Sequence, residues 1–250
     1  MNKGRKSLFV QNKVIRRDII YRNQNAVHAL SSSPKIYEVY LFVNPIGLKC
    51  YRAEQEVLKI IDKLTDIKIH FRFVTFHNFN TVSHYMKRMN LPSNNLQLRN
   101  QTYHTIYDAC LAYKAALMQG KKRGRNFLLL LQKELTTNPI EYSDDLLATV
   151  AKGARLDVDM FFEDKNSEFV KSAYESDQRI AQEMNIVRTP SLVIFDSMNQ
   201  NYGVLIDDKL SSDLIEESLH HLGIQNQQHN KLLQKKNVHA IGKDYLRVIK

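Results

Sequence analysis

Apolar and polar residues alternate in three successive patterns near the start of the regular part of the chain. Residues 36–43 are almost continuously apolar and rich in β-branched and aromatic side chains, which predicts a strand buried on both faces. After a short loop, apolar residues recur at helical spacing up to Leu64, with Glu54 and Glu56 near the helix start, where carboxylates favour the macrodipole. Residues 67–74 then alternate at period two. This order predicts a βαβ unit with parallel strands.

A long helical region follows the second strand. Residues 77–100 are polar and rich in Asn, so we expect a surface excursion with a short helix around residues 82–89. Apolar residues from Ile106 to Leu117 then trace a helical stripe that ends at Gly120. Further helical patterns run up to Asn185, and they lie at residues 127–135, from residue 146 (with Ser143 as its candidate N-cap) and over residues 161–180.

A Thr-Pro dipeptide precedes the next buried strand. Because proline cannot donate to a central ladder, Thr189-Pro190 before residues 191–195 predicts a turn with a cis peptide bond, packed across from the loop after the first strand. Residues 202–206 follow as a partner strand and residues 210–222 as an amphipathic helix. The order β-α-β, helices, β-β-α predicts an α/β, thioredoxin-like fold with a large helical insertion.

These patterns divide the chain into a body and two tails. We expect residues 35–76 and 186–222 to form the thioredoxin-like domain, and residues 77–185 the inserted helical domain. Residues 1–34, which end in a Ser-Ser-Ser-Pro cluster, and residues 223–250 have no clear hydrophobic period. We therefore expect two basic, flexible tails.

The net charge of +10 is concentrated in those tails. Residues 1–35 carry +7 and residues 223–250 carry +5, which leaves −2 for the body between them. A fold that reads nucleic acid normally carries a basic stripe on its structured face, so a nucleic-acid partner is disfavoured. Three roles for the basic tails stay open, in decreasing order of preference. They are solvated, solubilising segments, docking of an acidic partner, and binding of a phosphate backbone. On the body, the basic run over residues 121–125 is interpreted as a solvated turn and as the best candidate for an acidic partner.

The two cysteines, Cys50 and Cys110, are too few for a disulfide framework or a zinc cluster. Cys110 lies on an apolar helical stripe, which favours a core position. Histidines show no metal-binding spacing, so we expect no metal and no cofactor. The first 22 residues lack the apolar core of a signal peptide, and no run of about 18 apolar residues occurs. We expect a soluble, cytoplasmic protein with no membrane partner.

Five short motifs occur in order along the body, and the stretch that they cover is roughly residues 35–222. They are Asn44-Pro45-Ile46-x-x-x-Cys50, Ala112-Tyr113-Lys114-Ala115-Ala116 continuing through Gln119-Gly120, Arg125-x-Phe127, Ile180-Ala181-x-Glu183-Met184, and Thr189-Pro190-Ser191-Leu192-Val193. Together they resemble the YjbH or SpxH adaptor family, in the DsbA-like branch of the thioredoxin superfamily. The resemblance implies a non-enzymatic adaptor that binds the transcriptional regulator Spx and promotes its degradation by the ClpXP protease.

The resemblance draws attention to the loop after the first strand. In thioredoxin-fold oxidoreductases this loop reads Cys-x-x-Cys, and the helix N-terminus lowers the pKa of the first cysteine. Here Gly47 stands in the place of that nucleophile and only Cys50 keeps a thiol, so we expect a degenerate site without dithiol chemistry. We assign no catalytic residue. The candidate binding region consists of Asn44, Pro45, Gly47, Cys50, Thr189 and Pro190.

Several alternatives remain open. Cys50 is either a packed remnant or a redox-sensing thiol favoured by Lys49 and Arg52. A DsbA-like thiol oxidoreductase, or a kappa-type isomerase or glutathione transferase, would need a nucleophile or hydroxyl that neither Gly47 nor Leu48 supplies. A nucleic-acid-associated protein would depend wholly on the tails.

Overall fold

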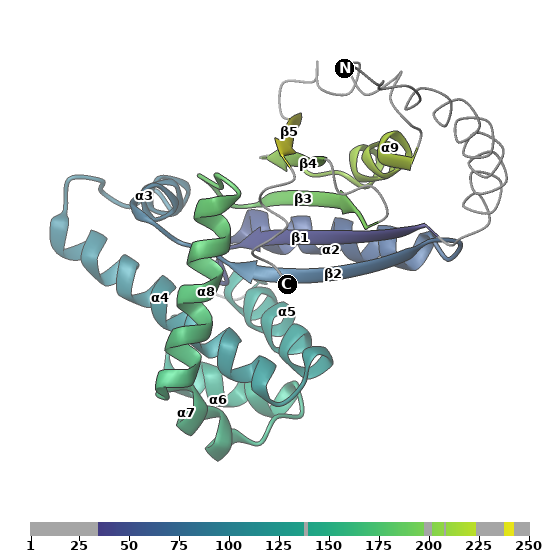
Figure 1. The fold of residues 1–250 in the computed structure, drawn as a ribbon. Helices are drawn as coiled ribbons and strands as arrows, with labels where there is room; N and C mark the ends of the chain where they lie inside the picture. Colours follow the sequence, from purple (N-terminus) through teal and green to yellow (C-terminus); the bar gives the residue numbers. More distant parts are fainter. Residues whose placement is uncertain (1–34, 138–139, 198–201, 208, 224–237, 243–250) are drawn as a thin grey trace, which may run out of the picture. The chain divides into compact units, whose positions relative to one another are not determined.

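The computed structural model describes residues 35–137, 140–197, 202–207, 209–223 and 238–242, which contain a five-stranded sheet and eight helices (Figure 1). The strands are β1 (Ile36–Val43), β2 (Lys68–Thr75), β3 (Ser191–Asp196), β4 (Tyr202–Asp207) and β5 (Val238–Gly242). The helices are α2 (Leu48–Lys63), α3 (Phe79–Arg88), α4 (Leu96–Met118), α5 (Lys121–Thr137), α6 (Asp144–Gly153), α7 (Val158–Lys165), α8 (Glu168–Glu183) and α9 (Ser212–Gly223).

The strands are arranged in the order β2-β1-β3-β4-β5. β1 and β2 pair in parallel, as the predicted βαβ unit requires, and the other neighbours pair antiparallel. In the β1–β3 register Phe42 is opposite Ser191, the residue that follows Thr189-Pro190. The end of β1 and the start of β3 therefore lie side by side, although they are far apart in sequence.

Helices cover both faces of the sheet. Val39 and Leu41 of β1 belong to a core cluster with α2 and α9, whereas Tyr40 and Phe42 belong to a second cluster with α8. Figure 1 shows α8 in front of the sheet and α2 behind it. Because β1 is buried on both sides, its sequence is apolar at nearly every position, and the predicted strand is confirmed.

The helices between β2 and β3 pack around an apolar cluster of their own. Its largest fully buried side chains include Ile106, Phe127, Leu147 and Phe161. The Ser143 hydroxyl accepts a hydrogen bond from the Leu146 amide at 3.3 Å and so caps α6, as predicted. The thioredoxin-like fold with a helical insertion is confirmed. No helix in the described ranges is long and apolar enough to cross a membrane.

Two segments differ from expectation. Residues 77–100 are not a surface excursion, because α3 buries Val82 and Met86 completely and α4 already begins at Leu96. Asn78 and Asn95 are the N-caps of these two helices, so Asn residues that we interpreted as loop formers start helices instead. In addition, residues 238–242 of the expected C-terminal tail form β5, which pairs with β4. The other residues of both tails lie outside the described ranges.

A buried ionic cluster joins the helices to the sheet. Asp177 of α8 is fully buried and pairs with Lys114 of α4 and with Arg72 of β2, the latter at 2.9 Å. The Thr75 amide and hydroxyl each donate to the same carboxylate at 3.0 Å. Burial lowers the pKa of Lys114, and its attraction to Asp177 opposes that shift. One carboxylate thus connects three elements.

Candidate functional site

The loop between β1 and α2 is closed by Asn44. Its side-chain Oδ1 accepts a hydrogen bond from the Ile46 amide at 3.0 Å, and its carbonyl oxygen accepts one from the Gly47 amide at 2.9 Å. Its own amide donates to Cys50 Sγ at 3.2 Å. Asn favours this kind of turn because its side chain can bond the backbone two residues ahead. The loop is therefore held by its own hydrogen bonds.

Cys50, in the first turn of α2, is 1% exposed. Burial raises the pKa of its thiol to about 12; hydrogen bonds from the Asn44 amide and with the Thr189 side chain oppose this rise. A thiol with so high a pKa is almost entirely protonated at pH 7. The other cysteine, Cys110, is also buried and free, and burial raises its pKa too. Neither sulfur is therefore a ready nucleophile.

Gly47 is the N-cap residue of α2 and contributes no side-chain cap. A Cβ atom built at this position would lie 3.2 Å from both Cys50 Sγ and the Asn44 carbonyl oxygen. The backbone angle φ of −94° is accessible to any residue, so the space rather than the backbone conformation limits what can stand here. A side chain at this position would therefore contact both the sulfur of Cys50 and the Asn44 carbonyl oxygen.

Thr189-Pro190 has the predicted cis peptide bond. Thr189 reaches the thiol of Cys50 through its side chain, so the dipeptide packs across from the loop as expected. The structure thus brings together all six residues of the candidate region, from the loop and from the entrance of β3. All six are buried, and the exposed residues beside them are Leu48 and Lys49 in the loop region and Val187 and Arg188 before Thr189.

Glu54 differs from its expected role at the helix start. It lies one turn after Cys50, is fully buried, and accepts a hydrogen bond from Gln132 Nε2 of α5 at 2.7 Å. Burial raises the pKa of Glu54 to about 8, and the bond from Gln132 opposes the rise. Oε2 of Glu54 and Oε1 of Gln132 have no hydrogen-bond partner among the described residues. A protonated Glu54 supplies the donor that this pair lacks.

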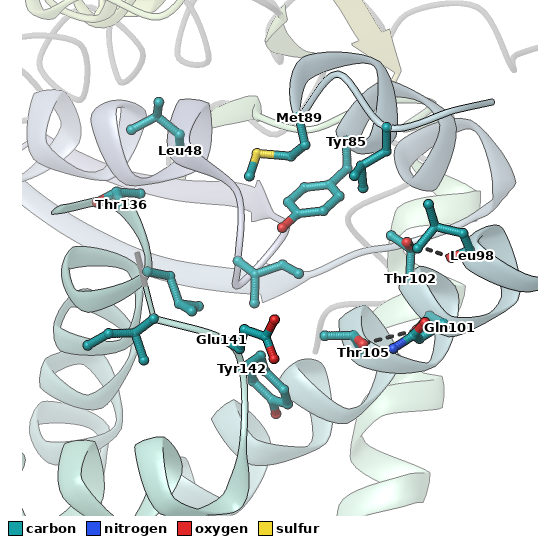
Figure 2. A pocket seen from close by; sticks show the side chains of 14 residues that line it. Leu48, Tyr85, Met89, Leu98, Gln101, Thr102, Thr105, Thr136, Glu141 and Tyr142 are labelled. Atoms are coloured by element: carbon teal, nitrogen blue, oxygen red, sulfur yellow. Dashed lines mark hydrogen bonds between the residues drawn. The ribbon is translucent and has the colours of Figure 1, made fainter. Parts of the chain in front are cut away.

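A cavity of about 470 Å³ opens beside the loop (Figure 2). Ile46 of the loop and Leu48 at the start of α2 form one wall, and the other walls come from the α3 end, from α4, and from the end of α5 with the segment after it. In Figure 2, Leu48 and Met89 lie on one side, with Thr102 and Thr105 along α4 and with Glu141 and Tyr142 opposite. The volume lies within the roughly 300–1,000 Å³ typical of binding pockets.

The cavity is lined by both apolar and polar side chains, and part of its lining is open to solvent. Leu48, Met89 and Ile140 are all exposed large hydrophobic residues on its rim. Below them, Tyr142 donates a hydrogen bond to Asp108 Oδ2 at 2.6 Å, which fixes the orientation of that ring. Exposed apolar side chains gathered round a hollow are typical of surfaces that bind other molecules. This is the accessible surface next to the candidate residues.

This cavity could not be predicted from the sequence. Its walls come from four separate stretches, and part of them belongs to residues 77–100, which had been interpreted as a surface excursion with a short helix. The spacing of Val82, Tyr85, Met86 and Met89 is helical and was the available signal. Among the described residues, no group of three His, Cys, Asp or Glu side chains could hold a metal ion.

Comparisons with known proteins agree with this architecture. The family model described as Thioredoxin matches residues 40–217. Three similar curated proteins are each named ClpXP adapter protein SpxH. They come from Bacillus licheniformis (26% identity, 79% of this chain and 71% of that protein), Bacillus subtilis (27%, 77% and 69%) and Bacillus cereus (28%, 80% and 74%).

Solved structures share the fold at low identity. BdbD from Bacillus subtilis, in its oxidised form, is 18% identical over 74% of this chain and 86% of that chain, with a TM-score of 0.51. A DsbA-type protein from Streptomyces coelicolor is 11% identical over 76% and 92%, with a TM-score of 0.58. These likenesses concern the fold alone.

Proposed function

Since the chain belongs to the thioredoxin family, and within its DsbA-like branch to the YjbH/SpxH family, we propose that it is an adaptor that binds the regulator Spx and promotes its degradation by the ClpXP protease. The role involves no chemistry by the chain itself. The same proposal includes a cytoplasmic location and no membrane partner.

The observation that carries the non-enzymatic part is the state of Cys50. A dithiol cycle requires an accessible thiolate and a second sulfur within bonding reach. The thiol of Cys50 is buried, its pKa is about 12, and it accepts a hydrogen bond from the Asn44 amide. In this site the sulfur serves as part of the loop structure.

The position of Gly47 supports the interpretation of a degenerate redox site. In a disulfide, the Cβ of one cysteine lies roughly 3 Å from the sulfur of the other, as the 2.05 Å S–S bond and the normal bond angles require. A Cβ at Gly47 would lie 3.2 Å from Cys50 Sγ. Gly47 thus stands where the missing sulfur would be attached, and its hydrogen atom replaces the nucleophile.

The cavity beside the loop is the proposed binding surface for Spx. The six candidate residues are themselves buried and do not line this cavity, so the contact is left to the exposed rim residues Leu48, Met89 and Ile140. A pocket formed by exposed apolar residues suits an apolar anchor of a partner protein.

The test is a reconstituted degradation assay with purified ClpXP and Spx. With wild-type protein we expect faster loss of Spx than without it, and direct binding of Spx by calorimetry. Cys50→Ala is expected to retain the effect, because the thiol makes no contact with solvent. Failure of the wild type to bind Spx or to accelerate its loss would reject the adaptor role.

A second assay distinguishes the adaptor role from the alternative role of a thiol oxidoreductase. Insulin reduction and disulfide exchange should show no catalytic turnover above the level of Cys50→Ser. Turnover that this substitution abolishes would favour a thiol enzyme over an adaptor, whatever the outcome with Spx.

A further inference from the structure

A second cavity, of about 260 Å³, lies where the β2 edge of the sheet meets the junction of α4 and α5. It shares no lining residue with the cavity beside the loop. Phe71 and Phe73 of β2 and Leu117 of α4 form apolar walls. Arg72, Lys121 and Arg125 line the same space. The cavity therefore combines an aromatic surface with three cations.

These cations are not neutralised by the described part of the protein. Arg72 shares the single carboxylate of Asp177 with Lys114, so one negative charge faces two positive side chains. Among the described residues, Lys121 and Arg125 make no ion pair, and the Arg125 guanidinium lies 4.9 Å from the centre of the Phe71 ring. The cavity is left with an excess of positive charge.

Helix stability does not explain the cations of α5. Its first five residues include Lys121, Lys122, Arg123 and Arg125, and its first turn has no acidic residue. Cations at the start of a helix oppose the macrodipole and cost stability. A costly group of cations beside an aromatic cavity indicates a binding role.

We propose that this cavity binds an acidic peptide segment of another protein, with one large apolar side chain held between Phe71, Phe73 and Leu117. Carboxylates next to that side chain pair with Lys121 and Arg125. The volume is below the roughly 300–1,000 Å³ of small-molecule sites, which suits one large side chain. The inference does not depend on the role proposed for the other cavity.

The charge of the chain identifies the source of the segment. Residues 1–35 carry +7 and residues 223–250 carry +5, so neither end of this chain supplies an acidic segment. Apolar walls suit a peptide side chain better than a phosphate backbone, whose charges favour an open basic groove. The occupant is therefore a separate acidic protein.

The test begins with a displayed library of random peptides of about nine residues, selected on the full-length protein. Counter-selection on the double variant Lys121→Gln/Arg125→Gln removes peptides that bind elsewhere. We expect the enriched peptides to contain acidic residues around a Phe, Leu, Ile or Trp. Labelled copies should lose about tenfold in affinity for the double variant, measured by fluorescence anisotropy at about 0.15 M salt.

A matched control separates the cavity from general charge attraction. Lys122→Gln/Arg123→Gln removes the same charge from the same helical turn, but neither side chain lines the cavity. It should change affinity by less than about twofold. Replacing the apolar residue of the peptide by Ser should weaken binding by about tenfold.

Three outcomes would overturn the proposal. They are equal losses in both double variants, a selection without acidic-apolar peptides, and a labelled oligo-dT that binds as tightly with the same dependence on Lys121 and Arg125. Thermal unfolding checks that each variant folds. The single variant Lys121→Gln, at an exposed position, gives the same comparison if the Arg125 change perturbs the structure.

Discussion

The backbone amide of Asn44 donates a hydrogen bond to the sulfur of Cys50 over 3.2 Å. The two residues lie at opposite ends of the loop that connects β1 to α2, so the thiol helps to close the loop from inside. A sulfur in this position has a structural partner, and its burial raises the pKa to about 12. The thiol therefore contributes to the structure of the loop, but it is too deeply buried and too weakly acidic to act as the nucleophile of a redox loop.

Gly47→Cys is expected to create a disulfide with Cys50, because the Cβ at position 47 already lies near bonding geometry. The variant has three thiols in total, including the two natural cysteines. Under mild oxidation, we expect only one thiol to react with Ellman's reagent in the denatured protein, and the mass to fall by about 2 Da. The control variant Leu48→Cys, which places the new cysteine at the exposed neighbouring position, should keep all three thiols free. Three free thiols in both variants would contradict the proposed position of the missing sulfur.

Glu54→Gln is expected to remove a pH dependence of stability. The folded-state pKa of Glu54, about 8, lies above its ordinary value of 4.5. At pH values between these two, the folded protein therefore holds a proton that the unfolded chain has released. The contribution of Glu54 to stability therefore falls as pH rises through this window, and this contribution levels off above about pH 8. The size is on the order of a few kcal/mol.

The measurement is urea unfolding between about pH 6.5 and pH 8, compared across variants. This range avoids buried His77, whose pKa is lowered to about 4 and whose effect has the opposite sign at lower pH. Glu56→Gln is the control on the same helix, since the pKa of Glu56 is lowered and its contribution is constant in this range. The prediction fails if the free energy of unfolding changes equally with pH in the wild type and in Glu54→Gln.

Asp177→Asn is expected to destabilise the fold by about 3–5 kcal/mol, because it leaves the buried Lys114 without its counter-charge. Denaturant unfolding measures the change. Glu175→Gln, at an exposed position of the same helix, should change stability by less than about 0.5 kcal/mol. A loss below about 1 kcal/mol for Asp177→Asn would show that the ion pair does not hold the helices to the sheet.

Met89→Glu is expected to weaken Spx binding by at least about tenfold, since it puts a charge on the apolar rim of the cavity beside the loop. Met89 is 55% exposed, and Met160 on α7 is 51% exposed without lining that cavity. Met160→Glu is thus a matched control and should bind within about twofold of wild type. Equal affinities for the two variants would move the binding surface elsewhere.

The elements that could be predicted from sequence are those with a strong local signal. The apolar run of β1 and Pro190 at a strand entrance each specify their structure through nearby residues. α3 was underestimated because Asn78 and its neighbours are polar. β5 is only five residues long, and it pairs with β4, which lies in a separate, earlier part of the sequence. The residues next to β5 therefore do not indicate this pairing.

The site shows a similar division. The loop and the Thr189-Pro190 turn were predicted to meet, and they do. The burial of Glu54 depends on α5, which packs over one face of α2, and nothing near Glu54 in the sequence indicates which face that is. The cavity was missed for the same reason, since packing between distant segments creates it.

The pairing of Phe42 with Ser191 has a consequence for synthesis of the chain. β1 is made early, and its parallel partner β2 follows within a few dozen residues, but the strand that covers its other edge begins only at residue 191. Until then the growing chain presents an open apolar strand edge, the kind of surface that pairs wrongly with other chains. The helices made in the meantime fold on local contacts, which form quickly. Closure of the sheet is therefore a late event, and until it occurs the nascent protein depends on its surroundings to keep that edge apart.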